Sequence, residues 1–333
     1  MATNTTEIVP TGAIRYNTDS NKMECFNGTK WMQIAVSSPD LNGGARGTFS
    51  GGQTPSYFNT IDYITIQTEG NATDFGDLTV ARSASGSVGS RTRGLQGGGY
   101  TGSNSDVIDF WTFSSTGDAT DFGNLVGAVH WTQPTSSATR GVWAQGNNPG
   151  NSNIIQYVTM ASSGNAVDFG DMSYGASVTA NSSNQSPTRG FFGGGTPTTT
   201  NVIEYITTAT LGNSQDFGDS STHVAREARG SSSTRALLIG GTRAEPSSAT
   251  IIDYFTMSSL GNATHFGDAS ASIKNSAGCS DSIRVAFAFG EAPSNVDTIE
   301  YVNISTGGGA VDFGNLTAAR NHSAGCSNAH GGL

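Results

Sequence analysis

The sequence predicts an all-β protein in which six copies of a four-stranded unit form a closed ring, preceded by a small separate module. Three observations support this prediction. A motif recurs at a nearly constant interval, the composition is typical of turn-rich sheet proteins, and the two ends of the repeat region are complementary fragments of one unit.

The recurring motif is Asp-Phe-Gly, with His in place of Asp in one copy. Its central residues are Phe75, Phe122, Phe169, Phe217, Phe266 and Phe313, which gives spacings of 47, 47, 48, 49 and 47 residues. A period of roughly 20 to 50 residues is typical of solenoids, propellers and other repeat architectures. The motif therefore indicates one repeat domain over residues 46–333.

The composition favours strands and turns over exposed helices. The chain has 333 residues, of which 45 are Gly, and only 13% of its residues are charged. Gly, Ser, Thr and Asn are abundant, as in proteins with many short strands and turns. Apolar residues make up 35% of the chain, which is low for one large core but sufficient for six thin sheets that bury modest faces.

The net charge of −10, with only 16 Lys and Arg, argues against a nucleic-acid partner because phosphate binding needs a dense basic surface. No apolar run approaches the ~18 residues of a membrane span, so no membrane insertion is expected. The N-terminal residues lack the basic and apolar regions of a signal peptide, which predicts synthesis in a cytoplasm. Three Cys are too few for a disulfide framework, and no metal or cofactor is expected.

Residues 12–34 contain three short apolar stretches separated by two turn signals. Residues 17–21 form the first break, and Asn27-Gly28 has the residue types preferred in a type I′ hairpin turn. A unit of two or three strands is marginally stable alone, so a packing partner is expected. Residues 35–45 have the composition of a flexible linker.

The leader module comprises residues 1–34, and its part from about Gly12 to Ile34 resembles the small hairpin module of tail-fibre and other virion structural proteins of bacteriophages. The resemblance rests on residues Gly12, Ile14, Arg15, Tyr16, Asn17, Glu24, Phe26, Asn27, Gly28 and Trp31. It implies anchoring or oligomerisation, for which the candidate residues are Ile14, Tyr16, Phe26 and Trp31. A hairpin that only caps the edge of the repeat domain is the alternative.

Each repeat is predicted to form four strands: a small-residue strand, an apolar strand ending in paired Gly, a strand with a central Tyr or Phe, and the strand with the Phe motif. In the second repeat these are residues 83–90, 92–99, 107–112 and 119–123. This order resembles the kelch repeat, which is about 50 residues long, although Phe stands where kelch repeats carry an outer-strand Trp. The resemblance implies a six-bladed kelch-like β-propeller.

Other positions keep the same register. One Arg opens the second strand of each repeat: Arg46, Arg93, Arg140, Arg189, Arg235 and Arg284. The third strand carries an aromatic residue: Tyr63, Phe110, Tyr157, Tyr205, Tyr254 and Tyr301. The paired Gly is replaced by Gln145-Gly146 and Phe289-Gly290 in the third and sixth repeats.

The two ends of the repeat region predict how the ring closes. The first repeat begins at its second strand, near Arg46, and residues 319–330 form a lone small-residue strand at the C-terminus. We expect this last strand to pair with residues 46–52 and complete the first blade. Such closure removes the open edges that make sheets prone to aggregation.

The repeated residues are predicted to be structural. Each Phe is expected to wedge between adjacent sheets, where its burial contributes roughly 1.5 to 3 kcal/mol. Local hydrogen bonding, rather than a metal or acid/base ring, is expected for Asp74, Asp121, Asp168, Asp216 and Asp312. The Arg of each repeat is expected to link neighbouring blades through carbonyls or carboxylates, and we hypothesise an Arg to Asp contact.

Function is expected on loops that do not repeat. The second-to-third-strand loops and the connections between blades share one face of a propeller, and binding residues concentrate on such loops. Candidate ligand-binding residues there are Tyr57, Phe58, Tyr100, Trp131, Tyr174, Arg243 and Glu245. Their aromatic rings and polar groups suit the binding of a sugar. An equally good interpretation is that these residues are solvent-exposed tips of turns with no ligand.

The function that these features favour is a structural appendage of a bacteriophage virion, in a fibre, tail or capsid decoration. Its partners would be other virion proteins, copies of itself, and a bacterial surface glycan or receptor. The alternatives are an intracellular kelch-type protein-interaction module and a carbohydrate-active enzyme, and no catalytic residues are assigned. His130, His223 and His322 lie near the predicted inner strands, but their irregular spacing does not support a central metal site.

Overall fold

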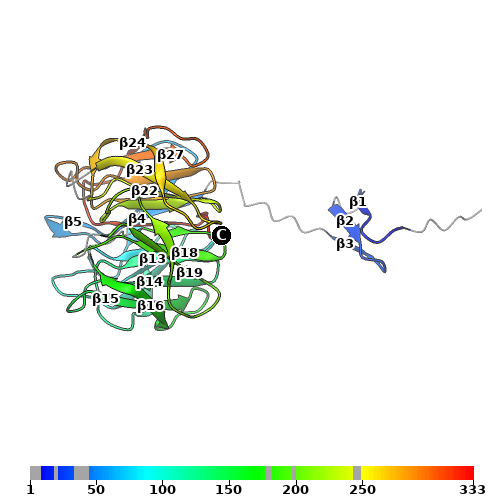
Figure 1. Cartoon of the computed structure of the whole chain (residues 1–333), viewed down its shortest axis with the longest axis horizontal. Helices are drawn as coiled ribbons and strands as arrows, with labels where there is room; N and C mark the ends of the chain where they lie inside the picture. The colour runs from blue at the N-terminus through cyan, green and yellow to red at the C-terminus, as the bar shows by residue number, and fades with distance from the viewer. Residues whose placement is uncertain (1–8, 19–21, 34–44, 178–181, 197–199, 243–248) are drawn as a thin grey trace, which may run out of the picture. The chain divides into compact units, whose positions relative to one another are not determined.

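The computed structural model describes residues 9–18, 22–33, 45–177, 182–196, 200–242 and 249–333. The chain divides into two compact units, Met1–Gly43 and Gly44–Leu333, and each is considered by itself. The first unit contains a three-stranded antiparallel sheet of β1 (Ile14–Asn17), β2 (Lys22–Phe26) and β3 (Trp31–Gln33) in that order (Figure 1). Among the described residues, no helix is long and apolar enough to cross a membrane.

The prediction of a type I′ turn at Asn27-Gly28 is wrong. Phe26 pairs with Trp31, so four residues connect the strands, and only Gly28 of the predicted pair has a positive φ, of 95°. The side-chain oxygen of Asn27 accepts hydrogen bonds from the N–H groups of Thr29 and Lys30 at 3.0 and 2.9 Å. Asn side chains commonly stabilise turns by accepting hydrogen bonds from the following backbone N–H groups. Here these bonds stabilise a four-residue loop instead of a two-residue turn.

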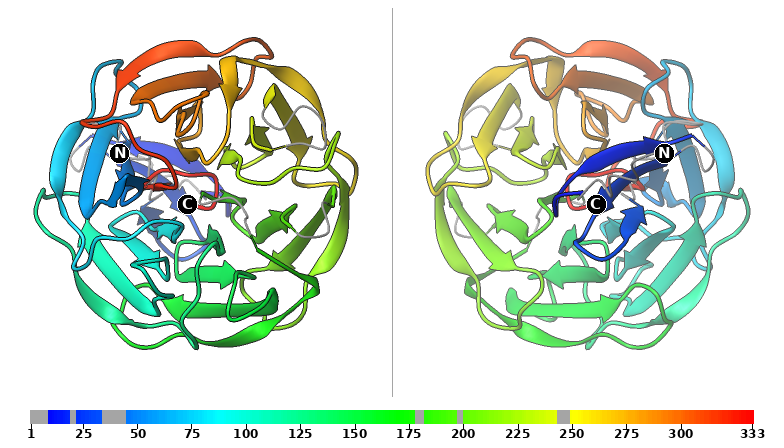
Figure 2. Two further views of the ribbon diagram at one scale, coloured as in Figure 1. Left: turned by 90° about the vertical axis from the view of Figure 1, so that its left-hand side faces the viewer. Right: turned by 90° about the vertical axis from the view of Figure 1, so that its right-hand side faces the viewer.

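The second unit contains six four-stranded antiparallel sheets, which follow one another around a ring in Figure 2. This confirms the predicted six-bladed propeller. From the inner to the outer strand, the blades are β29 (Ala324–Ser327), β4 (Arg46–Ser50), β7 (Thr60–Thr65) and β8 (Thr73–Asp77); β9 (Gly86–Gly89), β10 (Arg93–Gly97), β11 (Val107–Thr112) and β12 (Thr120–Asn124); β13 (Gln133–Ser136), β14 (Arg140–Ala144), β15 (Ser152–Thr159) and β16 (Val167–Ala176); β17 (Asn184–Gln185), β18 (Arg189–Gly193), β19 (Val202–Thr207) and β20 (Gln215–Asp219); β21 (Ala228–Ser231), β22 (Arg235–Ile239), β23 (Ala249–Thr256) and β24 (Thr264–Ile273); β25 (Ala277–Ser280), β26 (Arg284–Ala288), β27 (Thr298–Asn303) and β28 (Val311–Asn315).

The ring closes as predicted, because the C-terminal strand β29 pairs antiparallel with β4 and completes the first blade. The chain then continues past β29 across the ends of other inner strands. The N–H of Gly331 donates to the carbonyl of Ser231 at 3.0 Å, and Nε2 of His330 lies 2.6 Å from the carbonyl oxygen of Gly89. The last residues therefore tie the first blade to the second and fifth blades.

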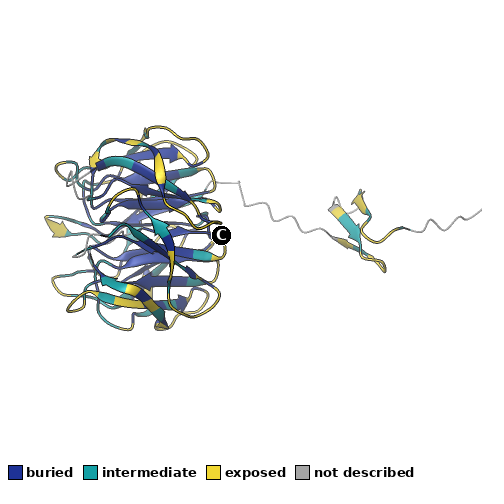
Figure 3. Cartoon of the chain, viewed as in Figure 1, coloured by how far each residue is buried: buried dark blue, intermediate teal, exposed yellow. Residues whose placement is uncertain are grey.

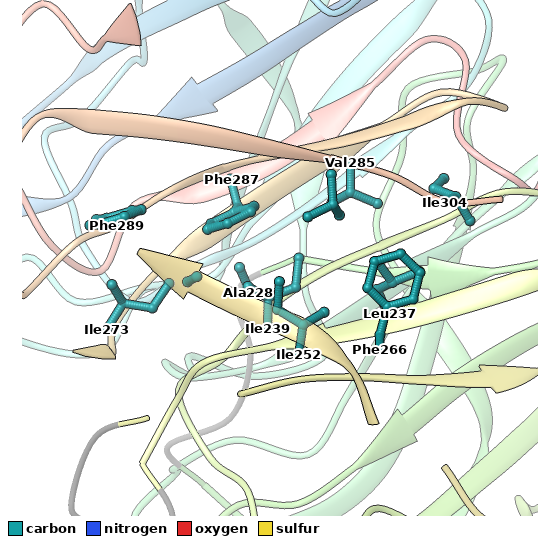
Figure 4. Close-up of a cluster of buried hydrophobic side chains, with 12 residues drawn as sticks. Ala228, Leu237, Ile239, Ile252, Phe266, Ile273, Val285, Phe287, Phe289 and Ile304 are labelled. Atoms are coloured by element: carbon teal, nitrogen blue, oxygen red, sulfur yellow. The ribbon is translucent and has the colours of Figure 1, made fainter. Parts of the chain in front are cut away.

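The hydrophobic core lies between the blades (Figure 3). The six motif Phe side chains are 2–7% exposed, and each ring packs edge-on against the third-strand aromatic ring of its own blade at 5.7–6.0 Å. Phe266 of the fifth blade also belongs to a cluster with Val285 and Phe287 of the sixth (Figure 4). The predicted wedge role of Phe is confirmed.

The Gly that follows each Phe allows two blades to approach at the rim. A Cβ atom on Gly76 would overlap the carbonyl group of Gly117 in the next blade, and the five other motif Gly residues make the equivalent approach to the next blade. At the same place the N–H of Gly117 donates to the carbonyl of Phe75 at 2.7 Å, and five equivalent bonds complete the circle. The motif Asp residues are exposed and, although described, make no hydrogen bond through their carboxylates, so the hydrogen-bonding role predicted for them is wrong.

The repeated Arg residues link neighbouring blades, as predicted. Each guanidinium donates to a main-chain carbonyl of the next blade at 2.6–3.4 Å and lies 4.3–5.1 Å from the aromatic ring of its own third strand. The hypothesised Arg to Asp contact is wrong. Among the described carboxylates only Glu69 lies within 4 Å of one of these guanidinium groups, 3.8 Å from that of Arg284. In every blade, the main-chain carbonyl just after the third strand accepts the hydrogen bond from the Arg of the preceding blade.

Candidate ligand-binding site

One position in the connections between blades repeats around the axis of the ring with an unusual backbone conformation. Ala84, Trp131, Arg226, Asn275 and His322 all have positive φ values, between 53° and 63°. Their main chains are linked from blade to blade: Trp131 N–H donates to Ala84 at 2.6 Å, Ala84 to His322 at 3.0 Å, and His322 to Asn275 at 3.0 Å. We call these five residues the axial ring.

A second set of residues surrounds the axial ring. Two positions in each repeat are joined by an isolated β-bridge. One is the residue that follows the Gly pair, and the other is the residue that precedes the axial ring position in the sequence. The bridged pairs are Ser83 with Tyr100, His130 with Asn147, Ser177 with Thr196, Ala225 with Thr242, Lys274 with Glu291, and Asn321 with Gln53. We call the axial ring and these pairs the axial face. Its backbone repeats from blade to blade, whereas its side chains differ.

Aromatic side chains form one side of the axial face. Tyr57, from the small hairpin of β5 (Gln53–Thr54) and β6 (Ser56–Tyr57), lies 6.1 Å from the ring of Tyr100. Tyr100 is 5.2 Å from His130, and His130 is 4.3 Å from Trp131. Trp131 in turn is 6.3 Å from His322. All five rings are half-buried, so they form a continuous, partly exposed aromatic surface.

Charged and amide groups form the other side. Lys274 makes a 3.1 Å salt bridge with Glu291, and the same carboxylate accepts a 3.0 Å hydrogen bond from the side-chain amide of Asn275. Arg226 is half-buried, and its side chain makes no hydrogen bond or salt bridge with any described residue. Burial lowers the pKa of Arg226, and the charge of Glu291 opposes this effect.

Burial favours the neutral form of both histidines of the axial face. Burial lowers the pKa of His130, although a hydrogen bond with the backbone of Asn147 opposes the effect. Burial, reinforced by the positive charge of Arg226, lowers the pKa of His322 to about 4. A neutral imidazole offers one donor and one acceptor, which suits the hydroxyl groups of a polar ligand.

The opposite end of the axis is covered by protein. The connections enter the inner strands at the axial face, and the C-terminal residues contact those strands where they end, at Gly89, Ser136 and Ser231. Two small cavities have volumes of about 10 and 60 Å³, and neither is lined by a residue of the axial face. The smaller is the size of one water molecule.

The structure brings together three of the seven predicted ligand-binding residues, Tyr57, Tyr100 and Trp131. Phe58 instead lies beneath the guanidinium of Arg320, 5.6 Å from it. Tyr174 donates a 3.2 Å hydrogen bond to the carbonyl of Gly194, and burial raises its pKa. These two residues are not part of the chain of aromatic contacts.

Two further predicted residues, Arg243 and Glu245, lie outside the described part of the chain. From the sequence, His130 and His322 were considered only as metal ligands, and Arg226, Lys274 and Glu291 were not selected. The sequence signal for all five residues is their place at repeat positions whose side chains differ from blade to blade. In the described residues, no group of three or more His, Cys, Asp or Glu is arranged to hold a metal ion.

The predicted anchoring residues of the first unit lie on both faces of its sheet. Ile14 and Tyr16 are 61% and 57% exposed and share one face with Met23 and Met32, which are 43% and 46% exposed. Phe26 and Trp31 pack together at 5.4 Å on the other face, where the guanidinium of Arg15 lies 4.2 Å from the Trp31 ring. The sheet therefore has an exposed apolar face.

The fold is thus a six-bladed β-propeller with an aromatic and charged axial face. No known family model matches the sequence. No curated protein matches it significantly.

Proposed function

We propose that the protein is a non-enzymatic appendage of a bacteriophage virion and that its propeller binds a host surface glycan at the axial face. The observation that supports this proposal most strongly is the aromatic surface from Tyr57 to His322 beside hydrogen-bonding groups. Sugar rings pack their apolar faces on aromatic side chains, while polar groups fix their hydroxyls. A binding site needs a few polar groups of this kind around an apolar surface.

The attachment part of the proposal rests on the first unit. Its resemblance to phage virion modules agrees with an apolar face that the sheet leaves exposed at Ile14, Tyr16, Met23 and Met32. A three-stranded sheet this small gains stability when such a face packs against another protein. We therefore assign this face to contact with another virion protein or another copy of the chain.

Two experiments test the two parts separately. Mass spectrometry of purified virions should detect the protein, and an Ile14→Ser/Met32→Ser variant should be depleted from them. A Lys30→Ser variant, which changes an exposed turn residue, is the matched control. Absence of the wild-type protein from virions would contradict the attachment part.

A glycan array tests the binding part. The full chain should bind a restricted set of bacterial glycans, and Trp131→Gly should abolish that binding. Gly suits the positive φ of 56° at this position, so loss of binding would not reflect a strained backbone. A flat array together with no binding to host cells would contradict the binding part.

A further inference from the structure

The axial face gathers positive charge in a protein whose net charge is −10. Arg226 and Lys274 approach it from the fourth-to-fifth and fifth-to-sixth blade connections. The Lys274 charge is neutralised by Glu291. Arg226 is half-buried and makes no salt bridge with a described residue, although the charge of Glu291 acts on it. A partly desolvated guanidinium favours a directly paired anion, and no described residue pairs with it in this way.

The backbone at Arg226 points to a role for its side chain. A positive φ costs a residue with a side chain roughly 1 to 2 kcal/mol, and Gly or Asn would avoid most of this cost. Asn is present at the equivalent position 275, so the ring accepts it. The side chain of Arg226 makes no hydrogen bond with a described residue in return. Its side chain is therefore expected to act on a molecule outside the chain.

Arg226 also lies close to the aromatic side. His322 feels the charge of Arg226, and the His322 ring is 6.3 Å from Trp131. Through His322, the guanidinium and the aromatic rings therefore belong to the same part of the axial face. Glu291, which is held by Lys274 and Asn275, adds a carboxylate whose charge acts on both Arg226 and His322. This carboxylate can accept a hydrogen bond from a sugar hydroxyl.

We infer that the axial face binds a sugar residue that carries a carboxylate, with Arg226 pairing with the carboxylate and Trp131 stacking on the ring. The planar guanidinium fork matches a carboxylate with two parallel hydrogen bonds. This inference rests on the proposed glycan-binding function and specifies the class of glycan. Uronic and nonulosonic acids are sugars of this kind.

The test compares acidic sugars with their own methyl esters, which differ only in charge at one group. The methyl glycosides of glucuronic acid, galacturonic acid and N-acetylneuraminic acid, and the three methyl esters, are titrated into the full chain and followed by calorimetry or ligand-observed NMR. At least one acid should bind about tenfold or more tightly than its ester, a ratio expected for one charge-assisted pair.

Two variants identify the groups responsible. Arg226→Gly should remove the preference for the acid over the ester. Ala84→Gly makes a comparable backbone change at the equivalent position and should keep the preference. Trp131→Gly should weaken binding of acid and ester alike, because both lose the stacking surface.

The outcomes separate the inference from the function on which it rests. Equal binding of acids and esters, still dependent on Trp131, would overturn the acidic-sugar inference and leave glycan binding intact. An unchanged acid preference in Arg226→Gly would also overturn it. If none of the acids binds and the glycan array is flat as well, both the inference and the glycan-binding function are wrong.

Discussion

The six repeated Arg side chains show how one residue can connect a blade to its own core and to its neighbour. The guanidinium stacks on an aromatic ring of the same blade and donates to a carbonyl of the next. Both interactions use the planar, delocalised cation of Arg, which Lys lacks. Since the last bond runs from Arg284 back to residues 66 and 67, the six links close around the ring.

Removing one link should lower stability measurably. We expect Arg189→Met to lower the free energy of unfolding by about 1 to 2 kcal/mol, because a charged hydrogen bond and a cation–π contact are lost together. Arg91→Met is the control, since Arg91 is exposed and makes no such contacts. Urea denaturation measures both. Equal stability of the two variants would contradict the linking role.

His330, in the C-terminal segment, is a buried histidine whose side chain is only 4% exposed. Burial lowers its pKa to about 4, compared with about 6.5 for an ordinary imidazole. Between these values the unfolded chain binds a proton that the folded chain does not. The contribution of His330 to stability is therefore complete above pH 6.5 and is lost as the pH falls towards 4, by about 2 kcal/mol at pH 5.

Chemical denaturation at pH 7.5 and pH 5 tests this prediction. His330→Gln should show a smaller loss of stability between the two pH values than the wild type. His265→Gln, which replaces an exposed histidine, is the matched control. The same pH dependence in His330→Gln and the wild type would show that the buried imidazole is not the titrating group.

At the scale of elements, the outer strands determine how closely the blades pack. The sequence correctly predicted that the motif Phe is buried between sheets. It did not reveal that the following Gly is required by the next blade, because that contact joins residues 41 positions apart, Gly76 and Gly117. Likewise, the Asp of the motif is exposed, whereas the third-strand acids Asp62 and Asp109 are fully buried.

The buried acids explain a further part of the blade interface. Asp62 and Asp109 accept hydrogen bonds from the connection that precedes them around the ring and pair with the fully buried Arg320 and Arg82 at 3.0 and 3.1 Å. Their acidic or amide counterparts in the other blades are Gln156, Glu204, Asp253 and Glu300. The regular spacing of this position was visible in the sequence, but its burial depends on the packing of adjacent blades.

The close approach of the blades can be tested with two Gly substitutions. Gly76 and Gly117 have similar backbone angles, with φ of 145° and 150°, so Ala strains the chain similarly at both. Only at Gly76 would the new Cβ overlap a neighbouring backbone. Gly76→Ala should therefore be less stable than Gly117→Ala by about 1 to 3 kcal/mol, as overpacking predicts. Equal melting temperatures would contradict this account of the rim.

At the scale of the whole molecule, the repeats build the scaffold and the differences between them build the candidate site. The blade number, strand order and closure by β29 were all predictable, since they depend on spacing and on the incomplete first and last repeats. Tyr57, Tyr100 and Trp131 were predictable as loop aromatics. Their association with His322 and Arg226 was not, because it joins residues from opposite ends of the sequence around the axis.

We assign glycan binding to the axial face rather than to the exposed rim of the propeller. Binding of the labelled full chain to host cells tests this assignment by comparing Trp131→Gly with Leu260→Ser, which alters a rim residue that is 63% exposed. Trp131→Gly should lose at least tenfold in affinity, as loss of stacking and hot-spot contacts typically causes, while Leu260→Ser should bind like the wild type. Undiminished binding by a folded Trp131→Gly variant would contradict the claim.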